Sequence, residues 1–141
     1  ASGNVLASVG SAGYLGTTNS GFVDMTNAVR SPGSTLKPLI YGLAFELGLA
    51  HPQSLIEDRP TAFNGYVPVN FDGFNRGTVT VHDALTESLN VPAVIVLDAV
   101  GVARLVSRLK RANANPLLPD ETAAGLAVGL GGVGVTLRDL V

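Results

Sequence analysis

The chain has 141 residues, 46% of them hydrophobic, which is enough for one domain with a substantial buried core. Its net charge is −2 and its nine lysines and arginines form no basic face, which argues against nucleic-acid binding. The absence of cysteine excludes a disulfide framework and a thiolate metal site. Only 14% of the residues are charged, so the chain either has an unusually large interior or is part of something larger.

The N-terminal quarter of the chain predicts two antiparallel strands followed by a helix. An apolar, β-branched run at about residues 4–10 and an alternating run at about 22–29 flank a loop rich in Gly, Ser and Thr. Pro32 and Gly33 end the second strand. Leucines and isoleucine then recur at helical spacing over about residues 33–48, which predicts a mostly apolar helix in the core.

The remainder predicts a long loop and further helices, and thus an α+β class. Residues 51–77 contain three prolines and three glycines without a sustained period, and loops of this length usually serve a function. Capping-box patterns begin at Thr80 and Thr136 and predict helix starts there. The expected helices lie at about 81–89, 92–100 and 102–112, the second with Pro92 at its first position.

A serine and a lysine in the first turn of the 33–48 helix form the first candidate for chemistry. Ser34 and Lys37 are three residues apart, so their β-carbons lie about 5–6 Å from each other on one helix face. Ser34 also lies near the positive end of the helix, where a developing oxyanion is stabilised. Pro38 lacks a backbone donor and fits only the first turn, which fixes the helix start near Ser34.

A second candidate, Ser88 and Asn90, lies between two predicted helices. Asn90 is either an N-cap for the helix that follows or a polar group of a site, and the two interpretations are compatible because capping leaves its amide nitrogen free. The chain also contains a second copy of each spacing, Ser107 with Lys110 and Ser2 with Asn4. Spacing alone therefore decides nothing, and we expect Ser107 and Lys110 to face solvent.

Two other patterns are weaker. Gly129 to Gly134 matches the dinucleotide fingerprint, but the required βαβ unit and the later acidic residue are missing from the sequence. His51 and His82 lack metal-ligand companions at useful spacing. We therefore expect no cofactor and no metal.

Three segments together resemble the transpeptidase domain of class A (bifunctional) penicillin-binding proteins, most like the 1C type. They are RSPGSTLKPLIYGLAFELGL at 30–49, GYVPVNFDGFNRGTVTVHDALTESLNVPAV at 65–94 and GLGGVGVTL at 129–137. Ser-x-x-Lys and Ser-x-Asn triplets are recorded signatures of this superfamily. The third signature, Lys-Thr-Gly, does not occur in these residues, and the resemblance places it downstream of Val141.

The resemblance implies a β-lactamase/transpeptidase-like fold, truncated here to two N-terminal strands and the mostly helical subdomain. It implies that Ser34 attacks the D-Ala-D-Ala bond of a peptidoglycan stem peptide, with Lys37 as base, Ser88 as proton relay and Asn90 as a substrate-binding residue. β-Lactams would acylate the same serine. The parent protein would carry an upstream glycosyltransferase domain and a membrane anchor, and would act on the periplasmic face of the inner membrane.

Other functions stay open at this point. A β-lactam-sensing or peptidoglycan-binding module would be acylated without turnover. A serine β-lactamase would need a water-activating glutamate, and Glu57 is the one plausible acid near the loop. We further expect the 141-residue chain on its own to lack transpeptidase activity and to self-associate, because the strands that would complete the sheet are missing.

Overall fold

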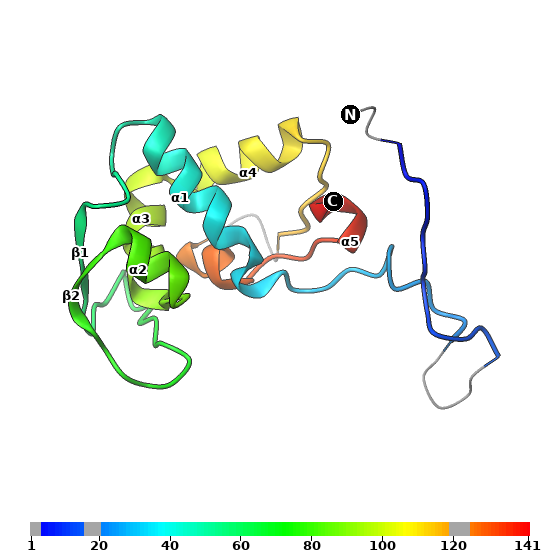
Figure 1. Cartoon of the computed structure of the whole chain (residues 1–141), viewed down its shortest axis with the longest axis horizontal. Helices are drawn as coiled ribbons and strands as arrows, with labels where there is room; N and C mark the ends of the chain where they lie inside the picture. The colour runs from blue at the N-terminus through cyan, green and yellow to red at the C-terminus, as the bar shows by residue number, and fades with distance from the viewer. Residues whose placement is uncertain (1–3, 16–20, 119–124) are drawn as a thin grey trace.

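The computed structural model describes residues 4–15, 21–118 and 125–141, and its elements confirm an α+β class (Figure 1). The chain order is η1 (Gly33–Leu36), α1 (Lys37–Glu46), β1 (Leu55–Asp58), β2 (Gly77–Thr80), α2 (Val81–Thr86), α3 (Asn90–Val100), α4 (Val102–Arg111), η2 (Leu126–Leu130) and α5 (Leu137–Leu140). The prefix η marks a 3₁₀ helix.

The core forms between α1 and α3, and α2, α4 and η2 close around this pair. Both central helices are apolar around most of their circumference, so both are buried on several sides. The most deeply buried side chains of the core are Leu36, Ile40, Tyr41, Val94, Leu97, Val100 and Leu105. Figure 1 shows α1 lying across α3, with η2 next to its N-terminal end.

Local sequence signals explain where several helices start. Pro38 lies in the first turn of α1, as predicted, where its missing N–H costs no intrahelical bond. The hydroxyl oxygen of Thr80 accepts a hydrogen bond from the Asp83 N–H at the start of α2. At α5 the capping box is complete, because Thr136 and Asp139 each bond the other's backbone N–H.

The two strands lie at positions other than the predicted ones. The prediction of strands at about 4–10 and 22–29 is wrong in this structure: no strand is assigned in either segment, although both are described. The Met25 N–H donates to the Gly10 carbonyl, and Arg30 forms an isolated bridge with Val135. A strand needs a neighbour to bond its backbone along its length. Residues 4–10 run apart from the helical body in Figure 1, and residues 22–29 contact α5 through the Thr26 carbonyl, which accepts from the Arg138 N–H at 3.2 Å.

β1 and β2 instead pair antiparallel at the two ends of the predicted 51–77 loop. Leu55 pairs with Thr80 and Asp58 with Gly77. The irregular residues 59–76 therefore form a loop whose two ends are held together by the paired strands. This pairing brings residues 59–76 up against the N-terminal end of α3.

The helix boundaries differ from the prediction by a few residues. α2 ends at Thr86, and α3 begins at Asn90, two residues before the predicted start at Pro92. Within the described ranges no single helix reaches the length and apolar content of a membrane span, and α3 with α4 reaches them only as a bent pair.

Candidate active site

Lys37, the first residue of α1, is the centre of the candidate site. Its side chain is only 1% exposed, and its Nζ donates to three oxygens. They are the Ser88 carbonyl oxygen at 2.6 Å, the Ser88 Oγ at 3.1 Å and the Asn90 Oδ1 at 2.7 Å. The structure therefore brings together three of the four predicted site residues, from two separate parts of the chain.

Burial changes the acid–base chemistry of Lys37. Its neighbours Leu36 and Ile40 are completely buried, and no salt bridge reaches Lys37 from the described residues. Desolvation of the ammonium lowers the pKa of Lys37 from 10.5 to about 8. Roughly one lysine in ten is then neutral at pH 7, which is a usable population for a general base.

Ser34 lies in η1, one turn before Lys37 on the same continuous helical segment. Gly33 precedes it with φ +54°, a conformation that glycine adopts without strain, and so turns the chain into the helix. The Ser34 side chain is exposed and its hydroxyl bonds to no other described residue. An exposed hydroxyl one helical turn from a buried amine is open to a substrate, and catalytic hydrogen bonds often tighten only when substrate is bound.

Ser88 occupies the left-handed position that ends α2. Its φ is +55°, its N–H donates to the Leu85 carbonyl at 3.0 Å, and the Leu89 N–H donates to the Ala84 carbonyl at 2.9 Å. This is a Schellman motif, in which the left-handed residue is usually glycine. A serine there costs conformational energy, and the same backbone turn directs both its carbonyl and its hydroxyl at Lys37.

Asn90 is the first residue of α3 and not its N-cap, so the capping interpretation is wrong. The N-cap is Leu89, which makes no side-chain cap bond. The Asn90 carboxamide bridges two segments: its Oδ1 accepts from Lys37, and its Nδ2 donates to the Val69 carbonyl at 2.7 Å. In this arrangement Asn90 holds Lys37, and its role toward substrate stays a prediction.

The glycine-rich run supports the Ser34 turn, a role that the sequence patterns did not reveal. Gly131 has φ +99°, and a β-carbon there would lie 2.8 Å from both the backbone nitrogen and the Cα of Gly33. The Ser31 hydroxyl donates to the Gly131 carbonyl at 2.8 Å. The run thus packs backbone against backbone beneath η1. It begins within the 3₁₀ helix η2, whereas a nucleotide fingerprint would follow a strand.

The remaining sequence candidates lie elsewhere. Ser107 and Lys110 are exposed on α4 and, as expected, bond to none of the site residues. The Ser2 part of the second Ser-x-Asn copy falls outside the described residues. Among the described residues no group of three or more His, Cys, Asp or Glu side chains could hold a metal.

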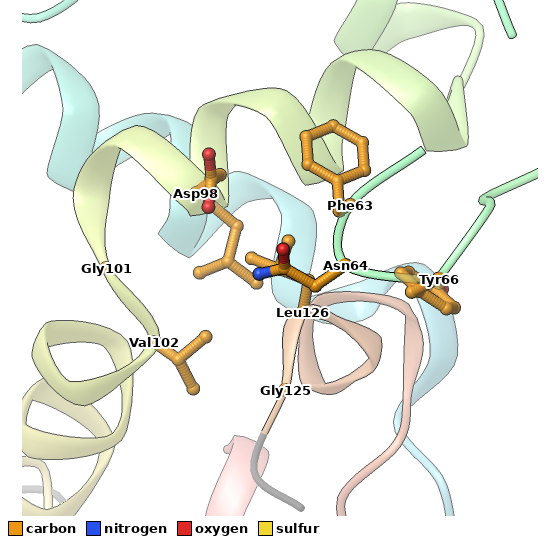
Figure 2. Close-up of a pocket in the computed structure, with 9 residues that line it drawn as sticks. Phe63, Asn64, Tyr66, Asp98, Gly101, Val102, Gly125 and Leu126 are labelled. Carbon is orange, nitrogen blue, oxygen red and sulfur yellow. The ribbon is translucent and has the colours of Figure 1, made fainter. Parts of the chain in front are cut away.

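The cavity shown in Figure 2 is not the candidate site. It has a volume of about 370 Å³ and lies between the Phe63–Tyr66 loop, the C-terminal end of α3 and the start of η2. Its lining includes Asp98 and Leu126 but none of the four predicted site residues. The hydrogen bonds of Lys37, not this cavity, therefore define the candidate active site.

Comparison with known proteins gives consistent matches. Residues 1–123 match the family model described as penicillin binding protein transpeptidase domain. The chain is 44% identical over 132 residues to penicillin-binding protein 1C of Escherichia coli (strain K12), covering 94% of this chain and 17% of that protein. It is 43% identical over 133 residues to penicillin-binding protein 1F of Bacillus subtilis (strain 168), covering 93% and 17%.

Solved structures show the same fold at lower identity. The structure of PonA1 from Mycobacterium tuberculosis in complex with penicillin V has a TM-score of 0.72 at 20% identity, over 82% of this chain and 34% of that one. Penicillin-binding protein 1A from Haemophilus influenzae has a TM-score of 0.68 at 21% identity, over 86% and 18%. The chain thus spans about a sixth of the length of the two curated relatives.

Proposed function

We propose that this chain, which belongs to the penicillin-binding protein transpeptidase domain family, carries the nucleophile and the proton-transfer groups of a serine acyltransferase. The donor substrate is a peptidoglycan stem peptide ending in D-Ala-D-Ala, and β-lactams acylate the same serine. The observation that carries the proposal is the contact between Lys37 Nζ and Ser88 Oγ at 3.1 Å, one helical turn from Ser34.

In the first step the Ser34 Oγ attacks the carbonyl carbon of the bond between the two D-alanines. The neutral Lys37 amine takes the hydroxyl proton, and the Ser34 oxygen bonds to the carbonyl carbon to give a tetrahedral oxyanion. The proton then passes to the nitrogen of the departing D-alanine, and the C–N bond breaks, which leaves an ester between Ser34 and the peptide. An acceptor amine next attacks the ester and forms the new amide bond, and one of its own N–H protons passes to the Ser34 oxygen as that oxygen leaves.

The surroundings of Lys37 determine the route of the proton. The Ser88 carbonyl oxygen and the Asn90 Oδ1 only accept hydrogen bonds, so neither can carry a proton from Lys37 to the leaving group. The Ser88 hydroxyl can both donate and accept. Ser88 is therefore the relay between Lys37 and the leaving group.

The start of the helix contributes to oxyanion stabilisation. The Ser34 N–H finds no acceptor within the described residues and lies at the positive end of the η1–α1 segment. It is one of the two donors that a tetrahedral oxyanion needs, and each such donor is worth about 10²–10³ in rate. The second donor would come from outside the contacts described here.

The β-lactamase alternative has no support from Glu57. That side chain is exposed on β1, where its carboxylate accepts from Arg59 Nε at 2.5 Å and from Thr78 Oγ1 at 2.8 Å. These hydrogen bonds lower the pKa of Glu57, so the carboxylate is committed to surface contacts and bonds to none of the site residues. A water-activating glutamate would have to contact the Ser34 side of α1.

The proposal extends to the protein that carries this chain. Its relatives are class A penicillin-binding proteins, so we place the domain outside the cytoplasm, in a membrane-anchored protein with a glycosyltransferase domain. The partners proposed for the site are stem peptides and β-lactams, without a metal or cofactor.

The test is release of D-alanine from a synthetic D-Ala-D-Ala pentapeptide by the purified full-length protein that carries this chain, with and without an added amine acceptor. We expect D-alanine together with the cross-linked product, loss of both in Ser34→Ala, and wild-type activity in Ser107→Ala, which removes the serine of the second Ser-x-x-Lys copy. A module that only senses β-lactams would release no D-alanine, and a β-lactamase would hydrolyse penicillin with rapid turnover.

A further inference from the structure

Asn70, in the irregular segment between β1 and β2, caps α3 from a distance of 20 residues along the chain. Its side chain is 95% buried, at 5% exposure. Its Oδ1 accepts from the Asn90 N–H at 2.7 Å and from the Val91 N–H at 3.4 Å. Neither α3 nor its N-cap residue provides a side-chain cap of its own.

This one carboxamide completes the hydrogen bonding of the helix start. The N–H groups of an N-cap residue and of the first three helical residues have no intrahelical acceptor. For α3 the Leu89 N–H donates to the Ala84 carbonyl, and Pro92 has no N–H. The N–H groups of Asn90 and Val91 remain, and both donate to Asn70 Oδ1. The first turn of α3 therefore depends on Asn70.

Asp58, the last residue of β1, holds Asn70 in place. It is fully buried, and both of its carboxylate oxygens accept from Asn70 Nδ2 at 2.9 Å. It also accepts from the Arg76 backbone N–H at 2.6 Å and from Asn75 Nδ2 at 3.3 Å. A buried carboxylate is costly unless donors surround it, and here the donors fix its position.

The same segment clamps Asn90 at two points. Asn70 holds the Asn90 backbone, and the neighbouring Val69 carbonyl accepts from the Asn90 side chain. The free oxygen of that side chain, Oδ1, is the one that lies 2.7 Å from Lys37 Nζ. A continuous chain of hydrogen bonds therefore runs from Asp58 through Asn70 and Asn90 to Lys37.

We propose that Asp58 and Asn70 are positioning residues for Lys37: they fix the start of α3 so that Asn90 and Ser88 hold the amine against the nucleophile. The inference rests on the proposed function, in which Lys37 is the base for acylation of Ser34. Neither positioning residue touches the reacting atoms, so its loss should slow the chemical step and leave non-covalent binding of the substrate nearly unchanged.

The first experiment replaces Asn70 by alanine in the full-length protein that carries this chain and follows acylation by a fluorescent penicillin in stopped flow. The dependence on penicillin concentration separates the dissociation constant from the acylation rate constant. We expect the rate constant to fall about 10- to 100-fold, the loss typical of a misplaced catalytic group. Amide hydrogen exchange at Asn90 and Val91 should accelerate. Asn75→Ala, which removes a donor to Asp58 but leaves the cap, should stay within about threefold of wild type.

Exchanging the side chains of Asp58 and Asn70 tests whether the hydrogen bonds between them position Lys37. Asn70→Asp places two carboxylates in contact. Asp58→Asn replaces one acceptor oxygen by an Nδ2 donor that faces the Asn70 Nδ2 donor, so each single variant should acylate slowly. In the double variant the introduced carboxylate still accepts from the first turn of α3, and the introduced amide donates to it. We expect the double variant to recover to within about tenfold of wild type, a rescue that a general loss of stability would not give.

The outcomes separate the inference from the proposed function. Wild-type acylation rates in folded Asn70→Ala, or a fall no larger than the unfolded fraction, would overturn the positioning role and leave the proposed function intact. If Asn70→Ala does not fold, the double variant Asp58→Asn, Asn70→Asp decides. A folded double variant that acylates as slowly as the single variants would overturn the positioning role. A wild-type protein that is not acylated at Ser34 would overturn both.

Discussion

The Nζ of Lys37 lies 2.6 Å from the carbonyl oxygen of Ser88, a residue whose backbone is in the left-handed conformation with φ +55°. The strained turn at the end of α2 and the buried amine at the start of α1 are thus one structural unit. Strain of this kind persists only where its surroundings enforce it. Here hydrogen bonds from both helices do so.

Acylation should depend on pH through the ionisation of Lys37. Only the neutral amine accepts the Ser34 proton, and burial places the pKa of Lys37 at about 8. The rate should therefore rise about tenfold per pH unit below pH 8 and level off above it. The check is the second-order rate constant for penicillin acylation from pH 6 to 10. A rate already level at pH 6 would remove Lys37 as the base.

Substitutions at Ser88 should separate its backbone role from its hydroxyl. Ser88→Gly and Ser88→Ala both lose the relay, so both should acylate equally slowly. Glycine tolerates the left-handed position, and alanine there retains a strain of about 1 kcal/mol. Thermal unfolding should therefore show Ser88→Gly to be more stable than Ser88→Ala by about this amount. Acylation at the wild-type rate in either variant would exclude the relay.

Gly131 should be required for the Ser34 turn. Gly131→Ala adds a β-carbon 2.8 Å from the Gly33 backbone at a position with positive φ, so it should destabilise the fold by about 2 kcal/mol and slow acylation. The control is Gly42→Ala within α1, where a β-carbon meets nothing within 4 Å. That variant should gain about 0.5–1 kcal/mol. A neutral Gly131→Ala in chemical denaturation would contradict the packing beneath η1.

The 141-residue chain on its own should associate through its N-terminal segment. Val5, Leu6 and Val9 are 66%, 95% and 79% exposed, and apolar side chains exposed in this way tend to find a partner. Light scattering should show a mass that rises with concentration and falls in the double variant Leu6→Ser, Val9→Ser. Leu55→Ser, at a leucine 71% exposed on β1, is the matched control. A monomer at high concentration would contradict the prediction.

Local patterns predicted much of the helical part because its signals are close in sequence. The Ser34–Lys37 spacing, Pro38 in the first turn and the Thr136 cap all act within one helical turn, and the structure contains each of them. The Lys37–Ser88 contact was expected only from the family resemblance, because no spacing rule joins residues 51 positions apart.

What the sequence did not predict depends on partners distant along the chain. The alternating pattern at 22–29 describes a strand only if a neighbour bonds it along its length. In the described residues it makes only isolated backbone hydrogen bonds to other segments, from Met25 to Gly10 and from Arg138 to Thr26. Asn70 looked like one polar residue in a loop, yet it caps a helix that begins 20 residues later. The stretch Val69–Phe71 would have misled a pattern-based prediction, because its apolar residues Val69 and Phe71 are exposed and the polar Asn70 between them is buried.

The measurement that tests the central claim most directly is peptide mapping by mass spectrometry of the full-length protein that carries this chain, after brief labelling with a fluorescent penicillin. The account predicts one acyl group per molecule, in ester linkage to Ser34, with labelling slowed by at least a hundredfold in Lys37→Ala. Labelling of Ser107→Ala should equal that of the wild type. A label on any other residue, or rapid labelling of Ser34 without Lys37, would contradict the account.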